Sequence, residues 1–190
     1  MRNIIVSLLC VVIVLATIVA FGHWELDEGK GLPVVARFTD NGDGTVTDKT
    51  TGLIWLKHAN CFGLLTWYEA MTTVADLATG QCGLTDGSSQ GDWRLPEKAE
   101  LLTLMSERYE CPALSNAAGT GPWMEGDPFS GVQPSPYWSA TGYEHYPDVV
   151  WLVLFSQGYR LYYANSSYAR KTGFCYVWPV RGRSSGLGRP

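Results

Sequence analysis

The chain has 190 residues and a formal net charge of −4 at pH 7, and 46% of its residues are hydrophobic. Eight Trp, ten Tyr and six Phe suffice for a sizeable core and are too many for a core alone, so some should lie on the surface. A net acidic chain of this kind gives no reason to expect a nucleic-acid partner.

The N-terminal segment is almost continuously apolar. Arg2 supplies a positive start, and residues 4–21 follow as a hydrophobic run with small residues such as Ala20 and Gly22 at its end. This pattern predicts a secretory signal peptide over residues 1–22, and the run is also long enough to remain as a membrane anchor. Both alternatives predict a secreted, periplasmic or cell-surface protein that touches the membrane only through this segment. Residues 23–36 read as a linker.

Four cysteines remain after the signal, at positions 61, 82, 111 and 175. An even number behind an export signal predicts two disulfides. Three pairings are possible, and we favour Cys61–Cys82 and Cys111–Cys175. A zinc site is the weaker interpretation, because no cysteine pair has the short spacing of zinc clusters.

The first predicted element is a β-hairpin. Residues 37–40 and 45–48 flank Asn41-Gly42-Asp43-Gly44, and both Asn-Gly and Asp-Gly favour tight turns. Asp40, Asp43 and Asp48 are also weak candidates for a calcium site, although their spacing does not match an EF-hand. Residues 53–56 are then typical of a buried strand.

Two helices follow. Thr66 and Glu69 match a capping box, apolar residues continue at helical spacing to Leu77, and Gly80 is a plausible stop. The second helix is expected to begin with Pro96 in its first turn. Just before it, Trp93 and Arg94 are predicted to fix this helix to a sheet, with Arg94 bound to a buried carboxylate or carbonyl.

The C-terminal half is predicted to be a sheet. Residues 111–136 form a long segment without periodicity, and strands are then expected at 137–141, 149–155, 159–163 and 174–181, with a disordered tail at 183–190. The order of elements predicts an α+β fold, with the domain spanning residues 37–182.

Charge is unevenly distributed along the chain. All 18 acidic residues lie within residues 1–150, whereas residues 151–190 contain six Lys or Arg. Such a basic end can bind polyanions, or its charges can pair with the acidic body of the domain.

Four sequence blocks resemble the C-terminal domain of the Legionella collagen-like adhesin. They are residues 37–55, from Arg-Phe-Thr-Asp to Gly-Leu-Ile-Trp; 92–101, with Asp-Trp-Arg-Leu-Pro; 137–141, Tyr-Trp-Ser-Ala-Thr; and 177–182, Val-Trp-Pro-Val-Arg-Gly. The chain departs from the pattern at Trp178, where we expect Arg. The family is similar to C-type lectin-like folds and, more distantly, to the formylglycine-generating enzymes.

The resemblance implies a C-type lectin-like domain in which two helices flank a twisted, mainly antiparallel sheet. It also implies extracellular adhesion, including binding to sulfated polysaccharides. We assign a structural role to Trp55, Trp93, Arg94, Pro96, Trp138 and Arg181.

These observations predict an exported, non-enzymatic binding module without a cofactor, such as an adhesin, whose partner is a polyanionic polysaccharide or a protein. The candidate ligand contacts come from the late strands, where Tyr and Asn are typical of adaptable binding surfaces: Tyr143, His145, Tyr159, Arg160, Tyr162, Tyr163, Tyr168, Arg170 and Lys171. An envelope subunit anchored by its N-terminal helix is the alternative. An enzyme of the formylglycine-generating type is less favoured. It needs redox-active cysteines, whereas an even number of cysteines in an exported chain favours structural disulfides.

Overall fold

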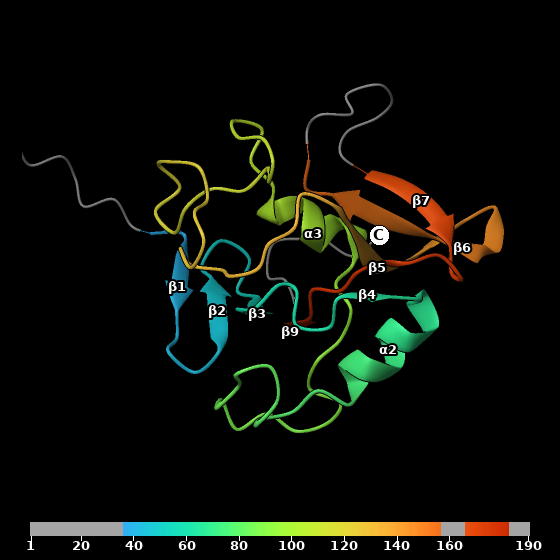
Figure 1. Cartoon of the computed structure of the whole chain (residues 1–190), viewed down its shortest axis with the longest axis horizontal. Helices are drawn as coiled ribbons and strands as arrows, with labels where there is room; N and C mark the ends of the chain where they lie inside the picture. Colours follow the sequence, from blue (N-terminus) through green and yellow to red (C-terminus); the bar gives the residue numbers. More distant parts are fainter. Residues whose placement is uncertain (1–35, 157–165, 183–190) are drawn as a thin grey trace, which may run out of the picture. The chain divides into compact units, whose positions relative to one another are not determined.

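The computed structural model describes residues 36–156 and 166–182, all of which belong to the unit Val35–Pro190 (Figure 1). The predicted signal segment, most of the linker, the predicted strand at 159–163 and the C-terminal tail lie outside the described residues. No helix within the described ranges has the length and apolar character needed to cross a membrane.

The predicted N-terminal hairpin is confirmed and forms part of a four-stranded sheet. Strands β1 (Phe38–Asp40), β2 (Thr45–Asp48), β3 (Ile54–Leu56) and β9 (Val180–Arg181) pair antiparallel in that order. Gly44 in the turn has a φ of 86°, and a Cβ there would collide with the backbone of Gly83. The turn therefore needs glycine both for its conformation and for its packing.

The second sheet carries the late strands. It contains β4 (Leu64–Leu65), β8 (Cys175–Tyr176), β5 (Pro136–Tyr143), β6 (Tyr146–Leu154) and β7 (Ser166–Arg170), in that spatial order. The β5–β8 pair is parallel and the others are antiparallel. Strand β6 lies inside the sheet, as its apolar run predicts, whereas the sequence did not predict β7.

The single strand predicted at 174–181 is wrong, because this segment belongs to two sheets. It forms β8, leaves the second sheet and then joins the first sheet as β9. Trp178 and Pro179 lie between the two strands and are both buried. Proline has no N–H to donate to a ladder, which suits it to the crossing point between two sheets.

Trp178 lies at the centre of the aromatic core. Its Nε1 donates a hydrogen bond to the carbonyl of Leu56 at 2.9 Å, and its side chain is fully buried. It contacts four other rings, with centroid distances between 4.9 and 5.8 Å, in Trp55, Phe129, Tyr137 and Phe155. These rings form an apolar environment that suits Trp178. The arginine of the family pattern would place a charge among them.

Both predicted helices are present and shorter than expected. Helix α2 (Trp67–Ala75) begins with the predicted capping box of Thr66 and Glu69, but it ends before Leu77. Helix α3 (Lys98–Leu104) begins after Pro96, because Glu97 is its N-cap and Glu100 completes the capping box. Helix α3 packs against β5 and β6, and α2 contacts β4. The described residues therefore form a mixed α/β fold of two helices and two sheets.

One of the two predicted disulfides is confirmed. Cys61 and Cys82 are bonded, with a Cα–Cα distance of 5.8 Å, and they join the segments before and after α2. The predicted Cys111–Cys175 disulfide is wrong, since both thiols are free. Cys175 lies in the core on β8 with 4% of its surface exposed, whereas Cys111 is exposed in the irregular segment after α3.

Candidate functional site

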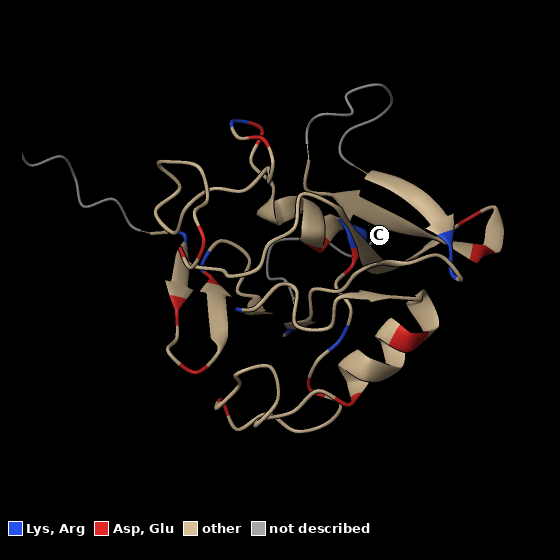
Figure 2. Cartoon of the chain, in the orientation of Figure 1, with Lys and Arg blue, Asp and Glu red and all other residues tan. Residues whose placement is uncertain are grey.

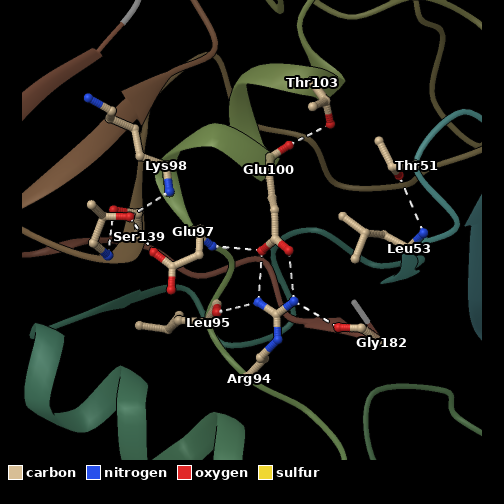
Figure 3. A network of polar contacts seen from close by, with 11 residues as sticks. Thr51, Leu53, Arg94, Leu95, Glu97, Lys98, Glu100, Thr103, Ser139 and Gly182 are labelled. Carbon is tan, nitrogen blue, oxygen red and sulfur yellow. Dashed lines mark hydrogen bonds and ion pairs between the residues drawn. The ribbon is translucent and has the colours of Figure 1, made fainter. Parts of the chain in front are cut away.

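Arg94 lies in a closed network at the start of α3 (Figure 3). Its guanidinium donates to both carboxylate oxygens of Glu100 at 2.8 Å and to the carbonyl of Gly182 at 2.8 Å. The same Glu100 carboxylate accepts the backbone N–H of Glu97. The hydrogen bonds from Arg94 to Glu100 raise the pKa of Arg94 despite partial burial.

The Arg94 network thus joins the helix start to the end of β9. Arg94 and Val180 also exchange backbone hydrogen bonds at 3.0 Å. All the groups involved already have partners inside the protein, as predicted for Arg94. This arrangement supports the fold and leaves little capacity for a ligand.

A second buried ion pair accounts for the structural roles assigned to Trp93 and Arg181. Asp86 has no exposed side-chain surface and lies 2.9 Å from a guanidinium nitrogen of Arg181. The guanidinium of Arg181 is 5.3 Å from the ring centroid of Trp93, whose Nε1 donates to Ser88. At this position the basic C-terminal end pairs with the acidic body, one of the two alternatives that the charge pattern left open.

The three weak calcium candidates each serve a different local contact. Asp40 binds the ammonium of Lys57 at 2.6 Å, and this hydrogen bond holds its pKa below the usual value. Asp43 accepts hydrogen bonds from the backbone and hydroxyl of Thr45. Asp48 pairs with Arg37. Within residues 36–156 and 166–182, no group of three or more His, Cys, Asp or Glu could hold a metal ion.

An aromatic surface covers the end of the second sheet where β5 turns into β6. We define it by the rings of Tyr143, His145, Tyr146, Trp151 and Tyr168. Tyr143 lies in the middle and contacts the other four, with centroid distances from 4.6 to 6.2 Å. Tyr146 and Tyr168 keep 59% and 55% of their surface exposed. The cluster therefore presents open ring faces to solvent.

Strand pairing explains why these rings meet. Tyr143 and Tyr146 are opposite each other across the two-residue turn that joins β5 to β6, and Trp151 is opposite Tyr168 in the β6–β7 pair. Residues that face each other across antiparallel strands have Cβ atoms about 5 Å apart. A bulge in β5 between Trp138 and Gly142 shifts the register just before the turn.

Charges of both signs surround the aromatic surface. The ammonium of Lys98 at the start of α3 lies 3.7 Å from the ring centroid of Trp151. Figure 2 shows acidic positions in the β5–β6 turn close to basic positions at the end of β7. The sequence has Glu144 in the turn and Asp148 in the first part of β6, and Arg170 and Lys171 at the end of β7. This end of the sheet is therefore close to electrically balanced.

A surface pocket of about 310 Å³ opens beside the aromatic surface. Strands β6 and β7 line it with Tyr146, Asp148, Val149, Tyr168, Ala169 and Arg170. Val149 and Arg170 are direct partners in the β6–β7 ladder, so the wall of the pocket is regular sheet. Asp148 directly precedes Val149, so its side chain points to the face opposite that of Arg170, and Arg170 is the charged side chain on the same face as Val149.

The structure brings together part of the predicted ligand set. Tyr143, His145 and Tyr168 belong to the aromatic surface, and Arg170 lines the adjoining pocket. Lys171 follows Arg170 and donates its backbone N–H to Asp148, but its ammonium lies over the start of α2, 4.5 Å from the ring centroid of Trp67. The remaining candidates, Tyr159, Arg160, Tyr162 and Tyr163, are outside the described residues.

Sequence reasoning did not include Tyr146, Trp151 and Lys98 in the site. The two-residue turn at Glu144-His145 lacks the Asn, Asp or Gly that marks such hairpins, so the sequence did not indicate that Tyr143 and Tyr146 lie opposite each other. Trp151 lies within the apolar run of the strand predicted at 149–155, a pattern typical of a central strand rather than of a binding surface. Nothing in the sequence indicates the approach of Lys98, which depends on how α3 packs on the sheet.

The described residues thus define a small mixed α/β domain with an open aromatic surface on its larger sheet. A family model, the Lcl C-terminal domain, matches residues 44–181, and the chain belongs to this family. The match includes both helices and every strand except β1. It confirms the resemblance that the four sequence blocks suggested. A comparison with curated proteins found no match.

Proposed function

We propose that this protein is an exported, non-enzymatic binding module that holds an acidic glycan on its aromatic surface, in the role of an adhesin. The observation that carries the proposal is the exposed ring cluster centred on Tyr143. Sugar rings stack on aromatic faces through their C–H groups, and phenolic hydroxyls can hydrogen-bond to sugar hydroxyls. Exposed, contacting rings on a rigid sheet supply such faces without reorganisation.

Export is supported by two independent features. The first 22 residues have the pattern of a secretory signal or anchor, and the Cys61–Cys82 disulfide is typical of proteins that fold outside the reducing cytosol. Membership in the Lcl C-terminal domain family agrees with a surface protein. The proposed location is therefore the secreted, periplasmic or cell-surface space.

A binding role is favoured over formylglycine-generating chemistry by the state of the two free cysteines. A reactive cysteine needs access and an ionisable thiol. Cys175 is buried, and burial raises its pKa to about 12, while Cys111 is exposed in a different environment. A redox-active pair requires two accessible thiols that can ionise. Cys175 has neither property, so the two thiols do not form such a pair.

An acidic glycan is favoured over a neutral one because cations flank the rings. Lys98 and Arg170 approach the aromatic surface from α3 and β7. Each could form a charge-assisted hydrogen bond with a carboxylate or sulfate of the ligand. The acids Glu144 in the β5–β6 turn and Asp148 in β6 limit the negative charge that the ligand can carry.

The test is affinity for immobilised polysaccharides at physiological salt. We expect the purified full-length chain to bind an acidic polysaccharide, either hyaluronan or heparin, more tightly than neutral dextran. Exchange of Tyr146 and Tyr168 for Ala should weaken this binding at least about tenfold, since buried aromatic anchors dominate interface energies. Phe174→Ala is the matched control, because Phe174 is 64% exposed and lies outside the aromatic surface.

Equal binding to acidic and neutral polysaccharides would reject the acidic preference. Retention of full affinity in the double variant would reject the aromatic surface as the site. Binding only to a protein, with no polysaccharide retained, would overturn the glycan assignment.

A further inference from the structure

A second group of exposed apolar side chains lies around the start of α2, and none of its members belongs to the aromatic surface. Seven large hydrophobic side chains are exposed within residues 36–156 and 166–182. Four of them belong to this group and keep between 40% and 64% of their surface exposed: Leu64, Tyr68, Met71 and Phe174. Exposed apolar side chains that gather in one place mark a contact with a partner or a membrane, whereas scattered ones are ordinary.

The start of α2 is joined to the turn that follows β7. The backbone N–H of Trp67 donates to the carbonyl of Lys171 at 3.0 Å. The Lys171 ammonium lies 4.5 Å from the ring centroid of Trp67 and 6.0 Å from that of Tyr68. Met71 follows these two aromatic residues by four and three positions, which places it on the same side of the helix. These four side chains therefore share one stretch of surface.

Strand pairing brings Leu64 and Phe174 close to this surface. Leu65 of β4 pairs with Cys175 of β8, and Leu64 and Phe174 are the residues next to this pair. Phe174 also follows the turn that begins at Lys171. We call the combined set the α2 patch: Leu64, Trp67, Tyr68, Met71, Lys171 and Phe174.

The α2 patch has the composition of a membrane-interface contact. Trp and Tyr collect at the level of the lipid headgroups, because their rings have an apolar body and a polar edge. Leu, Met and Phe bury their apolar surface at the boundary between headgroups and acyl chains. A lysine lays its apolar stem along such side chains and extends its ammonium to the headgroups. The nearby acid Glu69 accepts hydrogen bonds from the backbone N–H and hydroxyl of Thr66, so its carboxylate already serves the helix cap.

The N-terminal apolar run gives a reason to prefer a bilayer over another occupant. Residues 4–21 are long enough to remain in the membrane as an anchor. Residues 22–35 join this run to the described domain and can span at most about 50 Å when fully extended. An anchored domain therefore stays near the bilayer surface, where a high effective concentration favours even weak contacts.

We propose that the α2 patch docks on the bilayer that anchors the chain, with the rings of Trp67 and Tyr68 at the level of the headgroups and Lys171 beside lipid phosphate. This inference goes beyond glycan binding, and it adds a second membrane contact to the one predicted for the N-terminal segment. Since the α2 patch and the aromatic surface share no residue, variants can test the two contacts separately.

The experiment reconstitutes the full-length chain into vesicles of phosphatidylethanolamine and phosphatidylglycerol, at a protein density so low that most vesicles hold a single chain. One phospholipid carries a photoactivatable diazirine, and lipid adducts are mapped by peptide mass spectrometry. We expect adducts on the peptides that contain residues 64–71 and 171–176, in addition to adducts on the N-terminal segment. The N-terminal adducts measure how much of the chain is inserted and serve as the internal reference.

Variants of exposed side chains assign the contact. The double variant Tyr68→Ser, Phe174→Ser should lower the adducts on the α2 patch at least about fivefold relative to the N-terminal adducts, because membrane affinity scales with buried apolar area. Met124→Ser is the matched control, since Met124 is 69% exposed and lies outside the α2 patch. Lys171→Gln should also lower the patch adducts, whereas Lys171→Arg should keep them, because the anionic lipid attracts either cation. Near-UV circular dichroism checks that each variant is folded.

Lipid adducts confined to the N-terminal segment would overturn the proposal, as would an equal loss of patch adducts in Met124→Ser. If the patch gives no adducts at low protein density but cross-links to a second chain when the density is raised, its occupant is another copy and the proposal is wrong. The polysaccharide affinity of the Tyr68→Ser, Phe174→Ser variant should equal that of the wild type. Failure of the membrane contact therefore leaves the proposed function intact.

Discussion

The core and the surface of this domain each contain an aromatic cluster in which one ring contacts four others, but the two clusters have different roles. Trp178 in the core and Tyr143 on the surface each contact four other aromatic rings. The rings around Trp178 are fully buried, whereas Tyr146 and Tyr168 are more than half exposed. Clustering of rings alone therefore does not identify a binding site. Exposure of rings that the core does not need is the more informative property.

The cations show the same contrast. Arg94 donates to Glu100 and to the carbonyls of Leu95 and Gly182, and these bonds tie α3 to β9. Arg170 is exposed and lines an open pocket. A guanidinium that is saturated inside the protein stabilises the fold, and one that faces an open pocket can bind a ligand.

The largest expected contrast is between the two free thiols. Native Cys111 should react with a maleimide at the rate of an exposed cysteine, whereas Cys175 should react only when the domain opens. Burial also raises the pKa of Cys175 to about 12, which suppresses its thiolate. With a typical unfolding free energy, the rates should differ at least about a thousandfold.

Peptide mapping by mass spectrometry follows each cysteine separately. Cys111→Ser should remove the fast reaction without changing the slow one. If neither cysteine reacts with the maleimide until a reductant is added, and both then react, the two cysteines form a disulfide.

Truncation of the central core ring should be the most destabilising substitution. Trp178→Ala removes contacts with four rings and the hydrogen bond to Leu56, and we expect a loss of about 3–5 kcal/mol in unfolding free energy. If this variant does not fold, Trp178→Phe keeps most of the packing and should lose about 1–2 kcal/mol. Urea denaturation followed by tryptophan fluorescence measures both. A loss below about 1 kcal/mol for Trp178→Ala would contradict its central position.

Removal of Arg94 should have the next largest effect on stability. Arg94→Met leaves the Glu100 carboxylate, which is 6% exposed, without its main partner. Breaking such a pair costs about 3 kcal/mol, at the lower end of the usual range because Arg94 itself is 38% exposed. The double variant Arg94→Met, Glu100→Leu should recover part of this loss, because it also removes the stranded charge. If the double variant is as unstable as the sum of both single changes, the network is not the cause.

Acid should weaken the first sheet through Asp48. Burial disfavours the charged form of this carboxylate, but hydrogen bonds from Arg37, Thr50 and Thr51 outweigh it and hold its pKa below the usual value. A lowered folded-state pKa contributes stability above the unfolded-state value of about 4, and this contribution is lost as pH falls through the folded-state pKa.

The melting temperature should therefore fall between pH 5 and the acid limit more steeply in the wild type than in Asp48→Asn, with each protein compared with its own value at pH 6. Asp43→Asn is the control, since the Asp43 carboxylate accepts hydrogen bonds from the hydroxyl and backbone of Thr45 and does not pair with an arginine in the described residues. Identical slopes in the wild type and Asp48→Asn would exclude Asp48 as the cause.

Local patterns predicted the scaffold well. The Asn-Gly-Asp-Gly turn, the capping box at Thr66 and the Cys61–Cys82 disulfide depend on residues close together in sequence, and all three are present. The partner of Arg94 was predictable in kind, because a guanidinium next to a helix start needs a nearby acceptor.

Non-local features were less accessible. The residues 174–181 look like one strand, and only the tertiary fold shows that Trp178 fills the core between two sheets. Pairing of Cys111 with Cys175 followed from counting cysteines, which ignores burial. The aromatic surface depends on strand register, which places Trp151 opposite Tyr168 from segments that the sequence does not align.

The smallest expected change in stability belongs to the surface. Tyr168→Ala removes one ring of the aromatic surface but little buried area, since 55% of Tyr168 is exposed. We expect a loss of about 1 kcal/mol or less in unfolding free energy, from the contacts with Tyr143 and Trp151. The same substitution should weaken polysaccharide binding at least about tenfold. Trp178→Phe, in contrast, should lower stability and leave the affinity of the folded fraction unchanged. If Tyr168→Ala costs as much stability as the core variants, the surface rings belong to the scaffold, and exposure alone has misidentified them as a site.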